Sequence, residues 1–263
     1  MTKIHRLFLI SVLTVAVLLL LRGSAHDLVK AQASQDHKCF FPYIFKPETV
    51  HLDDFADQDP QWSMLNMQPT ASDTFCRHER RLFYCEIRDN ADRYVMYPGW
   101  RPLGDFKLEV NARFDRPYRR DPPAFQTRNG LGLIFGASDD WRQQYAYMLG
   151  YWGEQHAWAF LRYDGQTAEG KDIKTALSPY GGAPNYVYGY DSWNHLMIIR
   201  RGDMIILYCN GIRMPMPPPH YTYIMDGTYG TNRLIGLTIT SWEASFEKIE
   251  FDNFKYTPLS MPY

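Results

Sequence analysis

Residues Phe106-Lys-Leu108-Glu-Val110-Asn-Ala112-Arg-Phe114 alternate strictly between apolar and polar side chains. Successive side chains of a β-strand point to opposite faces of the sheet, so one face of this segment is apolar and the other is polar. The pattern predicts an antiparallel strand, Asp105–Phe114, with one face on a hydrophobic core and the other in water. This segment decides the fold class, because similar strands recur along the chain.

Short apolar or alternating segments continue to Tyr256, and no segment after Arg22 shows a helical repeat bounded by caps. The further predicted strands are Thr49–Phe55, Gln61–Met67, Leu82–Arg88, Tyr94–Tyr97, Gly130–Ala137, Gln144–Tyr151, His156–Tyr163, Trp193–Arg200, Met204–Arg213, Arg233–Thr240 and Phe246–Tyr256. Turns are expected at Asn129-Gly130, Asp164-Gly165, Gly202-Asp203, Asn210-Gly211 and Asp226-Gly227. Many strands without helices predict an all-β fold, a two-sheet antiparallel jelly-roll sandwich.

The N-terminus has the order of an export signal, a basic start followed by the apolar stretch Leu7–Leu21. This stretch is shorter than the roughly 20 residues that a bilayer span needs. We therefore expect a signal peptide at 1–33, an extended linker at 34–47 and the sandwich domain at 48–263, in a secreted protein. The alternatives are cleavage after Ala25, or an uncleaved segment that anchors the protein in the membrane.

Four cysteines are present, and export would place them where disulfides form. Cys76 and Cys85 flank the polar turn His78-Glu-Arg-Arg81, so a disulfide across a hairpin is expected. The pairing of Cys39 and Cys209 stays open. The absence of a Cys-x-x-Cys motif argues against a zinc or redox site.

The amino-acid composition argues against one class of partner, nucleic acid. The formal net charge is −1, and no strongly basic block occurs. A nucleic-acid partner is therefore not expected, because it leaves a cluster of Lys and Arg. Aromatic residues make up 16% of the chain, which suits both β-strands and surfaces that face sugars.

A series of segments gives the chain a more specific pattern. In order, these segments are Leu52-Asp-Asp-Phe55, Gln61-Trp62, Asp105–Val110, Asn129–Phe135, Gln144–Tyr147, Trp193–Leu196, Leu207–Gly211, Ile235–Leu237 and Ile249–Phe254. Their order resembles the concanavalin A-like lectin/glucanase superfamily, especially its laminin-G-like and keto-disaccharide-hydrolase-like branches. The resemblance implies a jelly-roll sandwich. It does not imply one activity, because the scaffold hosts many.

Catalytic residues are not expected. Glycosidases of this superfamily carry carboxylates in a Glu-x-Asp-x-x-Glu arrangement, whereas Glu243, Glu247 and Glu250 have spacings of four and three. No Gly-x-Ser-x-Gly motif indicates a serine nucleophile. A glycoside hydrolase with an unrecognised site remains an alternative.

Calcium is the one cofactor for which candidate ligands are found. Asp53 and Asp54 lie on the first predicted strand and Asp252 lies on the last, and these strands are often neighbours in such sandwiches. Carboxylate oxygens suit Ca²⁺. The competing interpretation is that these groups cap strand ends.

The best functional lead is an aromatic segment. Its candidate ligand-binding residues are Tyr145, Tyr147, Tyr151, Trp158 and Arg162. Rings can stack on the apolar face of a sugar while polar neighbours bond its hydroxyls. We therefore expect a secreted, non-catalytic module that binds a polysaccharide or glycan. A structural or adhesion domain with a protein partner is the first alternative, because exposed aromatic rings serve that role equally.

Overall fold

The computed structural model of the protein describes residues 50–55, 62–66, 75–79, 81–87, 94–102, 104–115, 129–152, 155–178, 181–187, 189–230, 234–241 and 247–259. All the described strands belong to one compact unit, Glu48–Tyr263. None of the described segments is a helix that is long and apolar enough to cross a membrane. The predicted signal peptide and linker lie outside the described residues.

The strands form a jelly-roll sandwich of two antiparallel sheets, as the sequence predicts. Sheet A follows the order β13-β12-β11-β6-β16-β4-β3, with β1 beside β16 and β14 beside β12. Its strands are β1 (His51–Asp53), β3 (Phe75–Glu79), β4 (Leu82–Ile87), β6 (Phe106–Asp115), β11 (Asn194–Arg201), β12 (Met204–Cys209), β13 (Ile212–Arg213), β14 (Ile224–Met225) and β16 (Glu247–Pro258).

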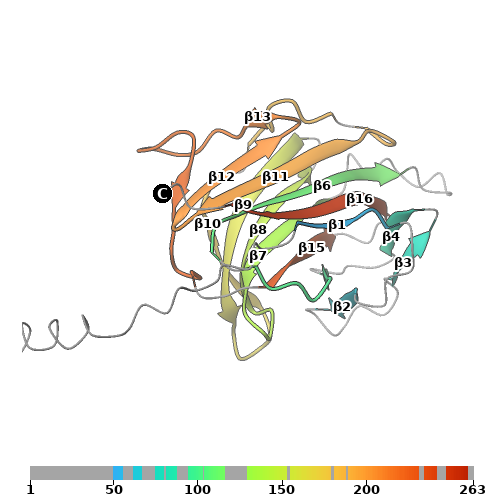
Figure 1. Cartoon of the computed structure of the whole chain (residues 1–263), viewed down its shortest axis with the longest axis horizontal. Coiled ribbons are helices and arrows are strands. Elements are labelled where there is room, and N and C mark those ends of the chain that lie inside the picture. Colours follow the sequence, from blue (N-terminus) through green and yellow to red (C-terminus); the bar gives the residue numbers. More distant parts are fainter. Residues whose placement is uncertain are drawn as a thin grey trace, which may run out of the picture. The chain divides into compact units, whose positions relative to one another are not determined.

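Sheet B follows the order β10-β9-β8-β7-β15-β5-β2. Its strands are β2 (Ser63–Asn66), β5 (Tyr94–Tyr97), β7 (Asn129–Ala137), β8 (Gln143–Trp152), β9 (Gln155–Gln166), β10 (Asp172–Ala176) and β15 (Leu234–Ser241). Figure 1 shows β6, β11, β12 and β16 side by side in one layer, with β7, β8 and β9 in the other.

Strand β6 confirms the alternation that decides the fold. Its buried and half-buried residues alternate without exception, and Phe106, Leu108 and Val110 point into the space between the sheets. Burying each such side chain contributes about 1.5–3 kcal/mol. The polar residues between them face the other side of sheet A.

The central strands of sheet B, β7, β8 and β9, differ because both of their faces are buried. All nine residues of β7 are buried. On β8, Tyr145 and Tyr147 join the core between the sheets, whereas Ala146 and Met148 join a second buried apolar cluster. The alternation along β8 thus separates two buried sets, and neither is an open surface.

Two of the predicted turns illustrate how glycine is used. Asn210 and Gly211 connect β12 to β13 with φ values of 48° and 79°, as a two-residue hairpin turn requires. The predicted turn at Asn129-Gly130 is wrong, because both residues lie inside β7. At Gly130 a Cβ atom would lie 2.9 Å from Oγ1 of Thr240 on the neighbouring strand, so glycine allows a close approach there.

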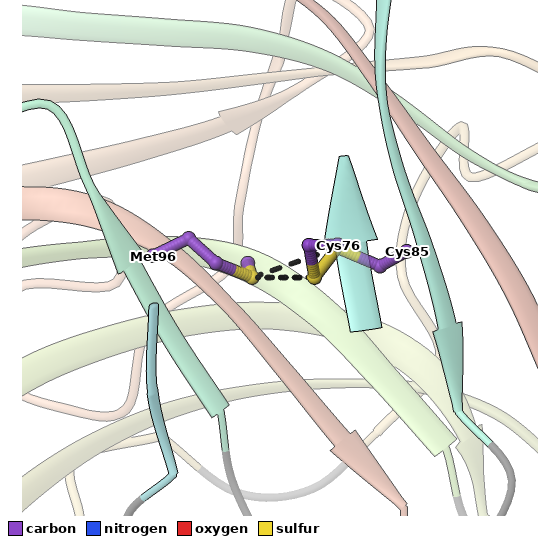
Figure 2. Close-up of a disulfide and its surroundings, with 3 residues drawn as sticks. All are labelled: Cys76, Cys85 and Met96. Atoms are coloured by element: carbon purple, nitrogen blue, oxygen red, sulfur yellow. Dashed lines mark hydrogen bonds between the residues drawn. A yellow bond between two sulfur atoms is a disulfide. The ribbon is translucent and has the colours of Figure 1, made fainter. Parts of the chain in front are cut away.

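The Cys76–Cys85 disulfide is confirmed. The two residues face each other across β3 and β4, with their Cα atoms 4.1 Å apart. Figure 2 shows the bridge against Met96 of β5, whose sulfur lies 3.4 Å and 3.6 Å from the two cysteine sulfurs. A disulfide carries no S–H, so these are van der Waals contacts that join sheet A to sheet B. Cys209 is a buried free thiol, and burial raises its pKa to about 12.

Candidate functional site

The aromatic segment that was predicted to bind a ligand lies mainly inside the sandwich. Tyr145 and Tyr147 are 0% exposed and Trp158 is 2% exposed. The Tyr145 ring stacks on Phe135 with centroids 5.0 Å apart, and the Tyr147 ring lies edge-on to Trp158 at 6.4 Å. Rings packed between two sheets have no free face for a sugar. The structure therefore corrects the expectation of a stacking platform for these three residues.

The two tyrosine hydroxyls make internal polar contacts. Tyr147 donates a hydrogen bond to the carbonyl oxygen of Tyr208 at 3.1 Å, which ties sheet B to β12. Tyr145 donates to a carboxylate oxygen of Asp226 at 2.8 Å. Burial raises the pKa of both hydroxyls well above the ordinary value for tyrosine. Both hydroxyls therefore stay protonated at neutral pH and can donate these hydrogen bonds.

Arg162 has a partly open side chain, which is 24% exposed. Its Nε donates to Asp164 and its Nη1 donates to Asp226, each at 2.8 Å. The charge of Arg162 is thus neutralised within the protein. The side chain links β9 to the segment around Asp226, which is a structural role rather than a ligand-binding one. The side chain of Tyr151, the remaining predicted ligand-binding residue, lies outside the described residues.

Arg162 belongs to a polar cluster, which we define as Tyr145, Arg162, Asp164, Asp226 and Tyr229. The Tyr229 hydroxyl donates to Asp164 at 2.5 Å. Asp226 accepts a further hydrogen bond from the backbone N–H of Thr228 at 2.9 Å. These contacts fasten the segment 226–230 to strands β8 and β9.

Both carboxylates of the polar cluster are held in the charged form. Partial burial raises the pKa of Asp226, but hydrogen bonds from Thr228, Tyr145 and Arg162 outweigh it and leave the pKa below the ordinary value. For Asp164, burial is likewise outweighed, chiefly by hydrogen bonds from Tyr229 and Arg162. The polar cluster is therefore intact at neutral pH.

A cleft with a volume of about 150 Å³ adjoins this segment at one end of the sandwich. Its walls come from the chain before β6, the β11–β12 turn, and the ends of β7 and β15. Gly104, Gly202 and Asp203 at the rim are exposed, whereas Phe106 and Ile235 are buried. The cleft therefore has an apolar floor and opens to solvent.

Arg200 places a buried cation in this cleft. The residue is 6% exposed, and its Nε donates to the carbonyl oxygen of Gly202 at 3.1 Å. Within the described part of the chain, no ion pair joins its guanidinium to a carboxylate. Buried charges in proteins are usually paired, and a guanidinium has five N–H donors. Arg200 can therefore donate to a molecule that enters the cleft.

Two carboxylates lie at the rim of the same cleft. Asp105 accepts a hydrogen bond from the backbone N–H of Gly202 at 2.7 Å, which fixes the β11–β12 turn. Asp203 packs against the backbone of Gly227 and leaves no room for a Cβ atom there. The cleft thus combines one guanidinium with two carboxylates, so it offers both donors and acceptors.

The aspartates proposed as calcium ligands do not form a metal site in the described chain. Strands β1 and β16 do pair, and the charge of Asp54 contributes, after burial, to the raised pKa of Asp252. However, the oxygens of Asp53 accept hydrogen bonds from the backbone N–H of Phe55 and from the indole of Trp62. No group of three or more potential ligands occurs among the described residues. Asp53 fits a strand cap better than a calcium ligand.

The sequence analysis missed Arg200, although one signal was present. On β11 the residues Asn194, Leu196, Ile198 and Arg200 are buried in alternation. A charged residue at an inward position of an alternating strand calls for a specific reason. The other residues that line the cleft come from distant segments, and only the fold brings them together.

No protein-family model matches the chain, and no curated protein matches its sequence. Among solved structures, the lumenal domain of VIP36 in its Ca²⁺/Man3GlcNAc-bound form is 12% identical over 82% of this chain and 92% of that chain, with a TM-score of 0.52. A xylan β-1,4-xylosidase from Bacillus halodurans is 14% identical over 78% of this chain and 38% of that chain, with a TM-score of 0.50. Carbohydrate-binding module CBM66 from Bacillus subtilis is 14% identical over 75% and 96%, with a TM-score of 0.46. At such identities these similarities concern the fold alone.

Proposed function

We propose that the protein is an exported, non-catalytic β-sandwich module that binds carbohydrate at or outside the cell surface. The cleft carries this proposal, because it sets the donors of Arg200 and the acceptors of Asp105 and Asp203 beside the apolar Phe106. Ligand sites typically combine apolar surface with a few placed polar groups. A sugar ring matches this set, because it has hydroxyls around an apolar face.

The fold is compatible with carbohydrate binding. The lumenal domain of VIP36, which shares the fold, is known in a glycan-bound form. A shared fold does not determine the ligand, so the similarity contributes a precedent only. The chemistry must come from the cleft of this chain.

Export is the second part of the proposal. It is supported by the basic and apolar order of the N-terminus and by the Cys76–Cys85 disulfide, because such bridges are rare in the cytosol. We propose a signal peptide at 1–33, a linker at 34–47 and the domain at 48–263. N-terminal sequencing of the exported protein should begin at Ser34. Recovery of an intact Met1 from membranes would indicate an anchor instead.

Binding to an array of neutral, amino and acidic glycans tests the function. We expect the exported protein to retain a subset of glycans, with a signal that soluble sugar of the same kind abolishes. Retention of no glycan, together with capture of a protein from the same surface, would favour an adhesion domain instead.

A glycoside hydrolase is a second candidate, because two carboxylates lie at the rim of one cleft and hydrolysis needs such a pair. Incubation with the retained glycans distinguishes the two functions. A binding module leaves them intact, whereas a hydrolase releases shorter products. Loss of release in both Asp105→Asn and Asp203→Asn would identify the pair.

A further inference from the structure

The cleft also indicates how much of a glycan it can hold. Sites for drug-sized ligands have volumes of about 300–1,000 Å³, and this cleft has about 150 Å³. The space is therefore too small for an oligosaccharide. It suits a single ring with its substituents.

The position of the cleft limits how a polymer can approach. The cleft lies at one end of the sandwich, and its floor residues Phe106 and Ile235 are 3% and 1% exposed. Both belong to the core between the sheets, which closes the inner side of the cleft. A sugar chain cannot thread through such a site. Since the space suits one ring, the remaining units of the chain stay outside the cleft, at the rim.

The charges in the cleft indicate which sugars fit. Arg200 contributes one positive charge, and Asp105 and Asp203 contribute two negative charges. A sugar carboxylate would meet one guanidinium and two like charges, which is unfavourable. An uncharged sugar avoids this conflict, because each hydroxyl can accept a hydrogen bond from a guanidinium and donate one to a carboxylate.

Two glycines, Gly104 and Gly230, line the cleft with backbone atoms only. Gly104 has a φ of 70°, and a Cβ atom there would meet nothing within 4 Å. At Gly230 a Cβ atom would lie 3.5 Å from Nη2 of Arg200. The guanidinium thus lies near the backbone of Gly230, and both line the cleft.

Together, and resting on the proposed carbohydrate-binding function, these observations lead us to infer that the cleft is a chain-end site for one terminal, uncharged sugar residue. Arg200 donates to the hydroxyls of that residue. The carboxylates of Asp105 and Asp203 accept from them.

Titration with a series of sugars tests this inference. The probes are the methyl glycosides of glucose, galactose, mannose and xylose, those of glucuronic and galacturonic acid, and linear oligosaccharides of two to six units of the neutral sugar that binds best. We expect extension beyond one unit to change the affinity less than about threefold. We expect the acidic counterpart to bind at least about tenfold more weakly, since its carboxylate would be repelled by Asp105 and Asp203.

Arg200→Met and Arg201→Met form a matched pair of variants, because Arg201 is the next residue on β11 and is exposed. Arg200→Met should lower the affinity about 10-fold to 100-fold, and Arg201→Met should leave it unchanged. Affinity that climbs steeply with chain length, acidic sugars that bind best, or equal behaviour of the two variants would refute the chain-end site and leave carbohydrate binding standing. Binding of none of these sugars or of the glycan array would refute both.

Discussion

Replacing Arg200 by methionine separates a ligand-binding role from a structural role. Methionine keeps a long unbranched side chain but carries no charge. If Arg200 held the sandwich together, its removal would leave a buried partner unpaired. The expected loss is then about 3–5 kcal/mol of unfolding free energy.

The structure predicts a much smaller effect. Removing a buried charge that has no ionic partner in the described chain is favourable, because its burial is costly. The hydrogen bond to the Gly202 carbonyl is lost, which costs about 1.5–3 kcal/mol for a charged donor. Gly202 is exposed, so water can replace the donor and reduce that cost. The two effects oppose each other, and we expect a net change within about 1 kcal/mol.

Thermal unfolding of the protein measures this change. A domain of roughly 150–250 residues shifts its Tm by about 2–4 °C for each kcal/mol. The Tm of Arg200→Met should therefore stay within about 4 °C of that of the unmodified protein, and Arg201→Met is the control. A fall of more than about 6 °C for Arg200→Met alone would show that Arg200 is structural, and the reasoning on its missing partner would be wrong.

Four further predictions follow from the fold and the polar cluster. Tyr145→Ala and Trp158→Ala should each lower the unfolding free energy by about 3–5 kcal/mol in denaturant titrations, because both rings are buried; a loss below about 1 kcal/mol would contradict their placement. Peptide mapping without reductant should show Cys76 linked to Cys85, and their joint replacement by serine should cost about 2–3 kcal/mol. The pKa of Asp226 is lowered by folding, so its contribution is complete above the ordinary aspartate pKa of about 3.9 and is lost as the pH falls through the lower folded value. In Asp226→Asn the unfolding free energy should therefore fall less steeply as the pH is lowered below about 4. An unchanged pH dependence would exclude Asp226 as the cause of the acid destabilisation. Chelation with EDTA should leave both Tm and glycan binding unchanged, whereas a loss that Ca²⁺ restores would point to a metal site.

The sequence predicts β6 and β11 well because each has one wet face; both differ from their predicted bounds by one residue at each end. Their alternating pattern reports directly on a single buried face. Strands β3, β10 and β14 were not predicted. The residues of β10 are mostly exposed, so no buried face marks that strand.

The error over the aromatic rings has a physical origin. Alternation correctly places Tyr145 and Tyr147 together on one side of β8 and Met148 on the other. It does not tell which side of the strand is buried, and at β8 both sides are. A ring such as Trp158 suits a core as well as a sugar surface, so composition does not resolve the choice.

The cleft lay beyond prediction for a different reason. Its polar groups come from before β6 and from the β11–β12 turn, with Asp105 and Arg200 nearly a hundred positions apart. Pairing of β6 with β11 brings these ends together, and that register is a property of the fold.

Locating the bound sugar shows whether the end cleft is the binding site. A crystal structure of the protein with the best-binding neutral oligosaccharide should show its terminal ring in this cleft, with hydroxyls bonded to Arg200 and to Asp105 or Asp203. A sugar that lies along the outer face of either sheet, with the cleft empty, would contradict the account.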